Sequence, residues 1–104
     1  MTMQPFLKAH ETDYAVGLLK ALANEVRLAT VCELKAGELT VAVLANRFGL
    51  SQSAMSQHLA RLRRAGLVRS RRKGTTIFYR LSNQEVSRRV NAIASACCPQ
   101  QLDS

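Results

Sequence analysis

The sequence predicts a mainly α-helical domain with one small β-hairpin, in the order helix, helix, helix, helix, strand, strand, helix. Apolar residues recur at helical spacing up to residue 66, short β-rich segments occupy residues 67–81, and helical spacing returns after residue 83. The length of 104 residues suits a single domain. We expect residues 12–98 to form it, between a flexible N-terminus (1–11) and a flexible C-terminal tail (99–104).

The first two helices are predicted on either side of Asn24. Apolar residues spaced three and four apart predict a helix over Thr12–Ala23. Asn24 is a preferred helix cap, so a second helix follows it, and Gly37 is expected to end that helix.

Two capped helices joined by a tight turn follow. Thr40 is expected to cap a helix over Val41–Phe48, and Gly49 to end it. Ser51 is then expected to cap a fourth helix over Gln52–Ala65. This spacing of caps predicts a helix–turn–helix.

A β-hairpin and a final helix complete the pattern. Leu67–Ser70 and Thr76–Leu81 are rich in β-branched and aromatic residues, and the basic segment Arg71–Thr75 between them predicts the turn. Ser82 or Asn83 is expected to cap the last helix.

The positive charge is concentrated in one block of the chain. The formal net charge is +8, and residues 39–84 contain nine Arg and Lys residues and no Asp or Glu. The rest of the chain has six basic and seven acidic residues. A solvated surface usually mixes both signs, so an acid-free block this long favours a polyanionic partner, and nucleic acid in particular.

Several classes of protein are excluded by composition. No apolar run is long enough to span a membrane, and the first eleven residues do not resemble a secretory signal, so we expect a cytoplasmic protein with reduced thiols. The sequence has no Ser/His/Asp arrangement, no glycine-rich phosphate loop and no paired carboxylates, so we expect no enzyme activity and no cofactor. RNA binding is disfavoured because stacking aromatic residues are few.

Short polar side chains at the start of the fourth predicted helix are suited to contact base edges in a DNA major groove. The alternative is an exposed polar face without a ligand. The basic turn of the hairpin is suited to phosphates or an adjacent minor groove. The candidate DNA-binding residues are Thr40, Ser51, Gln52, Ser53, Ser56, Gln57, His58, Arg61, Arg71, Arg72 and Lys73.

Four segments together resemble the ArsR/SmtB family of winged-helix bacterial repressors. They are Leu19–Leu28, Ser51–Leu59, Leu62–Val68 and Phe78–Leu81, and the resemblance extends over residues 14–98. It implies a winged helix–turn–helix fold (α-α-α-α-β-β-α) and a homodimer that represses transcription from an imperfect palindromic operator until an inducer arrives. Apolar seams on the first and last helices suit such pairing; their residues are Tyr14, Leu18, Leu22, Val86, Val90 and Ile93.

Metal sensing at the sites used in this family is not expected. Many members have a Cys-x-Cys pair on the third helix, where this chain has Thr40 and Ala42, and others place His and carboxylate ligands on the last helix, which has Glu85 and no His. A zinc or arsenic site needs three or four converging ligands.

The three cysteines are similar to those of a thiol-sensing branch of the family, the BigR/SqrR/HlyU-like repressors. That branch has one Cys at the position of Cys32 and another matching Cys98, with Cys97 as an additional candidate here. The resemblance implies that a persulfide or peroxide reversibly bridges Cys32 and Cys98 and weakens DNA binding. From the residues alone, Cys32 is equally compatible with an inert core position. The alternative is a regulator without thiol sensing, either metal-responsive through an unrecognised site or an anti-silencing activator.

Overall fold

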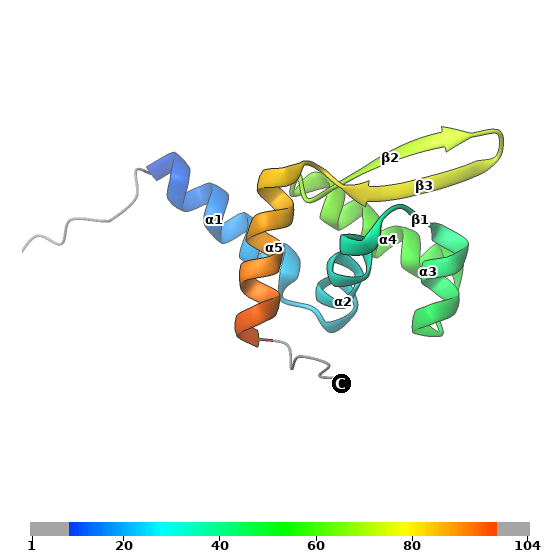
Figure 1. Ribbon diagram of the computed structural model, residues 1–104, viewed down its shortest axis with the longest axis horizontal. Coiled ribbons are helices and arrows are strands. Elements are labelled where there is room, and N and C mark those ends of the chain that lie inside the picture. The colour runs from blue at the N-terminus through cyan, green and yellow to red at the C-terminus, as the bar shows by residue number, and fades with distance from the viewer. Residues whose placement is uncertain (1–8, 98–104) are drawn as a thin grey trace, which may run out of the picture.

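The computed structural model describes residues 9–97 and confirms the predicted winged helix–turn–helix class. Five α-helices and a three-stranded antiparallel sheet share one apolar core. In Figure 1, helices α1 and α5 lie at one end of the molecule, and α3 and the tip of the hairpin lie at the other. The hairpin projects beyond the helices and is called the wing below.

Helix α1 (Ala9–Leu22) and helix α2 (Glu25–Glu33) meet at the predicted cap. The Oδ1 of Asn24 accepts a hydrogen bond from the backbone N–H of Arg27 at 3.0 Å, which confirms the cap. Helix α1 begins three residues before the predicted start, so it includes the last three residues of the segment predicted to be flexible. Helix α2 ends at Glu33, and a 3-10 turn (Leu34–Ala36) continues to Gly37.

The helix–turn–helix is formed as predicted by α3 (Val41–Phe48) and α4 (Gln52–Arg64). The hydroxyl of Thr40 accepts from the N–H of Val43 at 3.1 Å, and that of Ser51 accepts from the N–H of Ala54 at 3.0 Å. Gly49, with φ 65°, ends α3 in the left-handed conformation. Both helix starts are therefore fixed by side chains next to them in sequence.

The sheet contains one strand that the sequence did not predict. Strand β1 (Leu39–Thr40) pairs with β3 (Thr76–Leu81), which also pairs with β2 (Val68–Lys73), so the order is β1-β3-β2. The prediction of a five-residue turn over Arg71–Thr75 was wrong. Its first three residues belong to β2, and a two-residue loop beginning at Gly74 (φ 65°) joins the strands, because Gly tolerates a positive φ there.

Helix α5 (Gln84–Cys97) is capped by Asn83, whose Oδ1 accepts from the N–H of Val86 at 2.9 Å. Ser82, the other candidate cap, is buried, and its hydroxyl donates to the carbonyl of Gly66 at 2.7 Å. The start of α5 is therefore fixed against the end of the helix–turn–helix as well as by its own cap.

Four of the six residues predicted for a dimer interface lie in the core of the single chain. Leu18, Leu22, Val86 and Val90 are each at most 8% exposed. The reason is that α1 packs against α2 and α4, α5 packs against α2, and the apolar residues of both helices join one core. Ile93 is half-buried. Little of these side chains remains available to a second chain.

Tyr14, the remaining predicted interface residue, is 48% exposed and joins α1 to α5. Its hydroxyl accepts a hydrogen bond from Nη1 of Arg89 at 2.8 Å, and the guanidinium lies 5.3 Å from the centre of its ring. Arg89 also forms an ion pair with Glu85 at 3.2 Å. The contact therefore joins α1 to α5 at the end of the molecule that they share (Figure 1).

Candidate nucleic-acid interface

The N-terminal half of α4 presents the predicted row of polar side chains to solvent. Gln52, Ser53, Ser56 and Gln57 are exposed, whereas Met55 and Leu59 on the opposite side of the helix are fully buried. Core packing therefore sets the rotation of the helix and turns its polar side outward. Ser51 is also exposed, but its hydroxyl oxygen already caps the helix.

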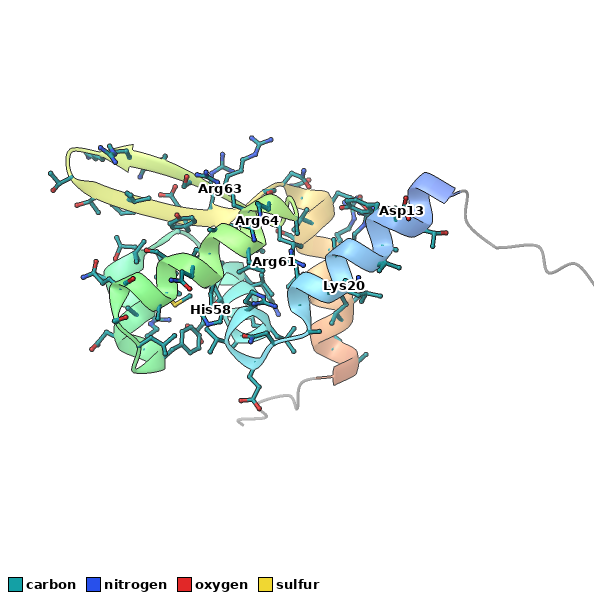
Figure 2. The ribbon with its side chains drawn as sticks, turned by 180° about the vertical axis from the view of Figure 1, so that it is seen from behind. Asp13, Lys20, His58, Arg61, Arg63 and Arg64 are labelled. Carbon is teal, nitrogen blue, oxygen red and sulfur yellow. The ribbon has the colours of Figure 1, made fainter. Side chains whose placement is uncertain are left out.

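The basic residues of α4 lie toward its C-terminal end. Figure 2 shows His58, Arg61, Arg63 and Arg64 along the half of α4 that is nearer to α1 than to the tip of the wing. His58 and Arg61 are half-buried, while Arg63 and Arg64 are exposed. Nη1 of Arg63 donates to the hydroxyl of Ser70 on β2 at 3.3 Å. The three arginines flank the polar row at its far end.

The wing carries Arg72 and Lys73 as exposed side chains directly before its tip. Arg71 differs from them. Its Nε and Nη2 donate to the two carboxylate oxygens of Glu38 at 2.8 Å each, and its guanidinium lies 4.5 Å from the centre of the Phe78 ring. Arg71 was predicted to lie in the turn; it is a strand residue whose charge is already paired.

The same pairing perturbs both ionisable groups. The hydrogen bond from Arg71 lowers the pKa of the Glu38 carboxyl below its usual value of 4.5, and the positive charges of Arg71 and Arg80 add to this against the opposing effect of desolvation. The hydrogen bond to Glu38 raises the pKa of Arg71 in turn. Both groups therefore stay ionised at neutral pH.

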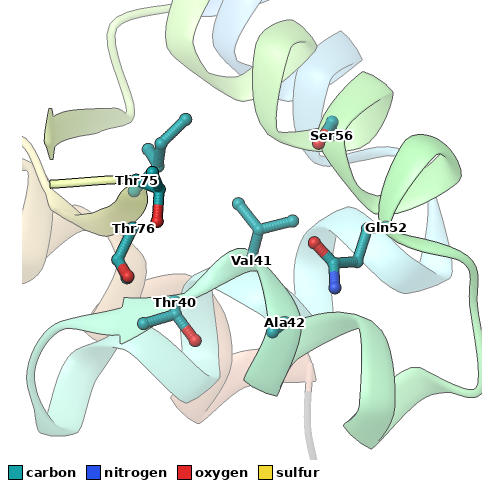
Figure 3. Close-up of a pocket in the computed structure, with 8 residues that line it drawn as sticks. Thr40, Val41, Ala42, Gln52, Ser56, Thr75 and Thr76 are labelled. Atoms are coloured by element: carbon teal, nitrogen blue, oxygen red, sulfur yellow. The ribbon is translucent and has the colours of Figure 1, made fainter.

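A groove separates the polar row of α4 from the wing. Its volume is about 430 Å³, and Figure 3 shows its walls coming from the start of α3, the start of α4 and the turn of the wing. Most of its polar lining consists of uncharged hydroxyl and amide groups. The lining residues are Thr40, Val41, Ala42, Gln52, Ser56, Thr75, Thr76 and Ile77.

Two contributions to this surface were missed by the sequence analysis. Thr75 and Thr76 line the groove although the prediction considered only the charged residues of the turn. Glu38 holds Arg71, and its only sequence signal is that it is the last acidic residue before the acid-free block. Without the register of the sheet, the sequence could not have assigned either contribution to this surface.

A search of known families matches residues 24–70 to one described as "Bacterial regulatory protein, arsR family". The transcriptional activator HlyU of Vibrio cholerae is 51% identical over 84 residues, which cover 81% of this chain and 78% of that protein. The chain belongs to the ArsR family. The matched segment runs from the cap of α2 into the wing and so contains the whole helix–turn–helix.

One further sequence relative and two solved structures are similar to this chain. The biofilm growth-associated repressor of Xylella fastidiosa is 42% identical over 81% of this chain and 74% of its own. The reduced form of V. cholerae HlyU superposes with a TM-score of 0.78 at 48% identity, covering 86% of this chain and 95% of that one. The homodimeric winged helix–turn–helix domain of Mb0332 from Mycobacterium bovis superposes with a TM-score of 0.81 at 33% identity. The match covers 92% of this chain and 89% of that one.

Family membership and the exposed surface lead to the same conclusion. This protein is a DNA-binding transcriptional regulator of the ArsR family, and its helix–turn–helix and wing are the candidate DNA-binding surface. Its sequence relatives compared above are both regulators of transcription rather than enzymes.

The predicted sensing residues are described only in part. Cys32 is half-buried on α2, which packs against α5. Cys97 is the last residue of α5, and Cys98 lies outside the described residues. Within residues 9–97, no group of three or more His, Cys, Asp or Glu side chains converges as a metal site would require, and no helix there is long and apolar enough to cross a membrane.

Proposed function

We propose that this regulator binds an imperfect palindromic operator as a homodimer and represses transcription until oxidation of Cys32 and Cys98 releases it. The observation that supports the DNA-binding mode is the groove in Figure 3, which has the exposed polar row of α4 on one side and the wing on the other. Two DNA-contacting elements therefore flank one channel.

In this mode, α4 enters the major groove with Gln52, Ser53, Ser56 and Gln57 toward the base edges. The wing reaches the neighbouring minor groove with Arg72 and Lys73. The sugar–phosphate strand that separates the two DNA grooves passes through the channel, where hydroxyl groups donate to its phosphate oxygens.

A homodimer is supported by the homodimeric Mb0332 domain, which superposes on most of this chain. A two-fold symmetric pair places two copies of α4 on two half-sites, so the operator repeats with the symmetry of the protein. Half-sites one helical turn apart, about 10 base pairs from centre to centre, suit two recognition helices on one face of the duplex.

The redox switch is supported by the place of Cys32 on α2, packed beside the helix that ends at Cys97. A peroxide takes two electrons and two protons from the two thiols, which join as a disulfide while the peroxide is reduced to water. Glutathione persulfide instead transfers its outer sulfur to each of the two thiols and leaves as glutathione. The two cysteine persulfides then join as a trisulfide, a longer bridge, and one sulfur leaves as hydrogen sulfide. Either bridge ties α2 to the end of α5, and the resulting shift of α2 against α4 weakens DNA binding.

The test combines mass spectrometry with a DNA-binding assay. The probe is a fluorescein-labelled 30-base-pair duplex selected from a random library by the reduced protein. Treatment with glutathione persulfide should add sulfur between Cys32 and Cys98, visible as a cross-linked peptide, and should release the duplex. Cys32→Ser and Cys98→Ser should each abolish both effects, while Cys97→Ser is the matched control and should respond as the wild type does.

Each result decides a separate part of the proposal. Release of the duplex from Cys32→Ser by persulfide would refute the dithiol switch but leave DNA binding intact. If the wild type neither selects nor holds any duplex, the proposed binding to an operator is refuted.

A second function, activation by relief of silencing, is favoured by one comparison. The V. cholerae relative at 51% identity is named a transcriptional activator, whereas the X. fastidiosa relative is named a repressor. A reporter driven by the bound promoter separates the two. Deletion of the regulator gene should raise expression if it represses, and should lower expression if it displaces a silencing protein.

A further inference from the structure

We propose that Glu38, Arg71 and Phe78, called here the Arg71 clamp, fix the wing in its DNA-binding orientation. Glu38 is then a positioning residue that strengthens DNA binding, although its own charge has the same sign as that of DNA. The inference rests on the DNA-binding mode proposed above.

The clamp spans the whole width of the sheet. Arg71 is on the edge strand β2, Phe78 is on the central strand β3, and Glu38 directly precedes β1 on the other edge. Arg71 and Phe78 are cross-strand partners, so their side chains lie on the same face. The guanidinium passes over the Phe78 ring at 4.5 Å and ends on the Glu38 carboxylate with two bonds of 2.8 Å.

The position of the clamp along the wing is what gives it a role. Strand β1 pairs with β3 only at Tyr79 and Phe78, so the sheet has three strands there and two strands farther out. Arg71 and Phe78 form the last pair before the two-stranded tip, which carries Arg72 and Lys73. Since an isolated two-stranded hairpin is marginal in water, the tip depends on its base for a fixed direction.

The clamp also joins the wing to the helix–turn–helix. Thr40 ends β1 and caps α3 with its hydroxyl, so Glu38 is two residues before the cap of the helix–turn–helix. The pair Glu38–Arg71 therefore links the wing to the start of the helix–turn–helix, whose second helix, α4, enters the major groove in the proposed mode. Bidentate guanidinium–carboxylate geometry restricts both distance and angle.

Substitution of Glu38 should change the affinity for DNA in opposite directions under the two possible roles of this residue. If Glu38 acts only as a charge, Glu38→Ala removes a repulsive acid and DNA binding becomes tighter. If the clamp positions the wing, the same variant weakens binding of the selected 30-base-pair duplex by up to about fivefold. Glu38→Gln keeps one oxygen acceptor for Arg71, so its affinity should fall between those of Glu38→Ala and the wild type.

Arg71→Gln and the double variant complete the cycle. In the clamp, Arg71→Gln weakens binding as much as Glu38→Ala does, and the double variant is no weaker than either single variant. The slope of log affinity against log salt stays that of the wild type, because Arg71 is paired with Glu38 rather than with a phosphate. A slope reduced by about one unit would instead show a direct phosphate contact and overturn the proposal.

A readout that does not involve DNA separates positioning from general stability. Backbone amide relaxation in the free protein should show lower order parameters for residues 72–77 in Glu38→Ala, with those of α4 unchanged. Glu33→Ala is the matched control, because Glu33 is also ion-paired with an arginine, Arg47, but this pair joins α2 to α3 and includes no residue of the wing. It should alter neither wing order nor affinity.

A failure of the clamp can be distinguished from a failure of the proposed DNA-binding mode. If the wild type holds no selected duplex, the proposed function fails before the clamp is tested on DNA, and the relaxation data still judge the clamp. If the duplex binds and Glu38→Ala binds it as tightly as the wild type or more tightly, the clamp is refuted and the DNA-binding mode stands.

Discussion

In the proposed DNA-binding mode, Gln57 lies where one amide side chain can distinguish one base pair. It is exposed in the polar row, and an amide can form two hydrogen bonds with adenine in the major groove. Gln57→Ala should therefore reduce the affinity difference between the selected duplex and its single-base variants by about 1–3 kcal/mol at one position. Affinities for a panel of single-base variants measure this directly.

Gln84→Ala is the matched control for that substitution. Gln84 is also an exposed glutamine on a helix, but it is the first residue of α5. Its substitution should leave the discrimination unchanged at every position. Unchanged discrimination in Gln57→Ala as well would mean that this residue does not contact a base.

The roles of single residues were predictable where their partners are close in sequence. The polar row and the caps at Thr40 and Ser51 depend on neighbours three or four positions away, and the structure confirms their places. Arg71 depends on a carboxylate 33 residues earlier, so its pairing required the sheet register. Local pattern alone assigned it to the contact surface.

Among the elements, the wing should contribute affinity without discrimination. Arg72 and Lys73 are exposed beside the tip of the wing, which the proposed binding mode places against phosphates or the minor groove. Arg72→Gln with Lys73→Gln should weaken binding to the selected duplex and to an unrelated duplex alike. The slope of log affinity against log salt should fall by about one unit for each lost phosphate contact.

A control for that double variant removes two charges elsewhere. Lys20 and Lys35 are exposed on α1 and on the 3-10 turn, so Lys20→Gln with Lys35→Gln lowers the net charge equally. This variant should keep the wild-type slope. An equal change of slope in both double variants would mean that net charge, rather than the wing, sets the salt dependence.

The elements differ in how far sequence could predict them, for a physical reason. The bounds of α3 were predicted at both ends because a cap and a glycine terminate it locally. Strand β1 has only two residues and exists because β3 pairs with it, so no local pattern marks it. Strand β3 has the predicted bounds, whereas β2 continues three residues beyond its predicted end, since the loop beginning at Gly74 needs only two residues.

For the whole molecule, helical periodicity identified the apolar seams but not what covers them. Leu18, Leu22, Val86 and Val90 were expected to meet a second chain, yet they complete the core of one chain. An apolar stripe has the same period in both cases, and only the packing of α1 and α5 decides between them. The large apolar side chains that α1 leaves exposed are Tyr14, Val16 and Leu19.

Leu19 therefore provides the sharpest test of a homodimer that uses α1. It is 56% exposed, so Leu19→Asp should not disturb the core, whereas a buried aspartate in an apolar interface would raise the dimer dissociation constant by about tenfold or more. Val43→Asp, at 38% exposure on α3, is the control, and it should remain dimeric by sedimentation. Helical content measured by circular dichroism should match the wild type in both variants.

Because one α4 contacts only one half-site in the proposed mode, Leu19→Asp should also lose affinity for the palindromic duplex while keeping its affinity for a half-site duplex. A Leu19→Asp protein that sediments as the wild type does would place any dimer contact elsewhere than on this face of α1.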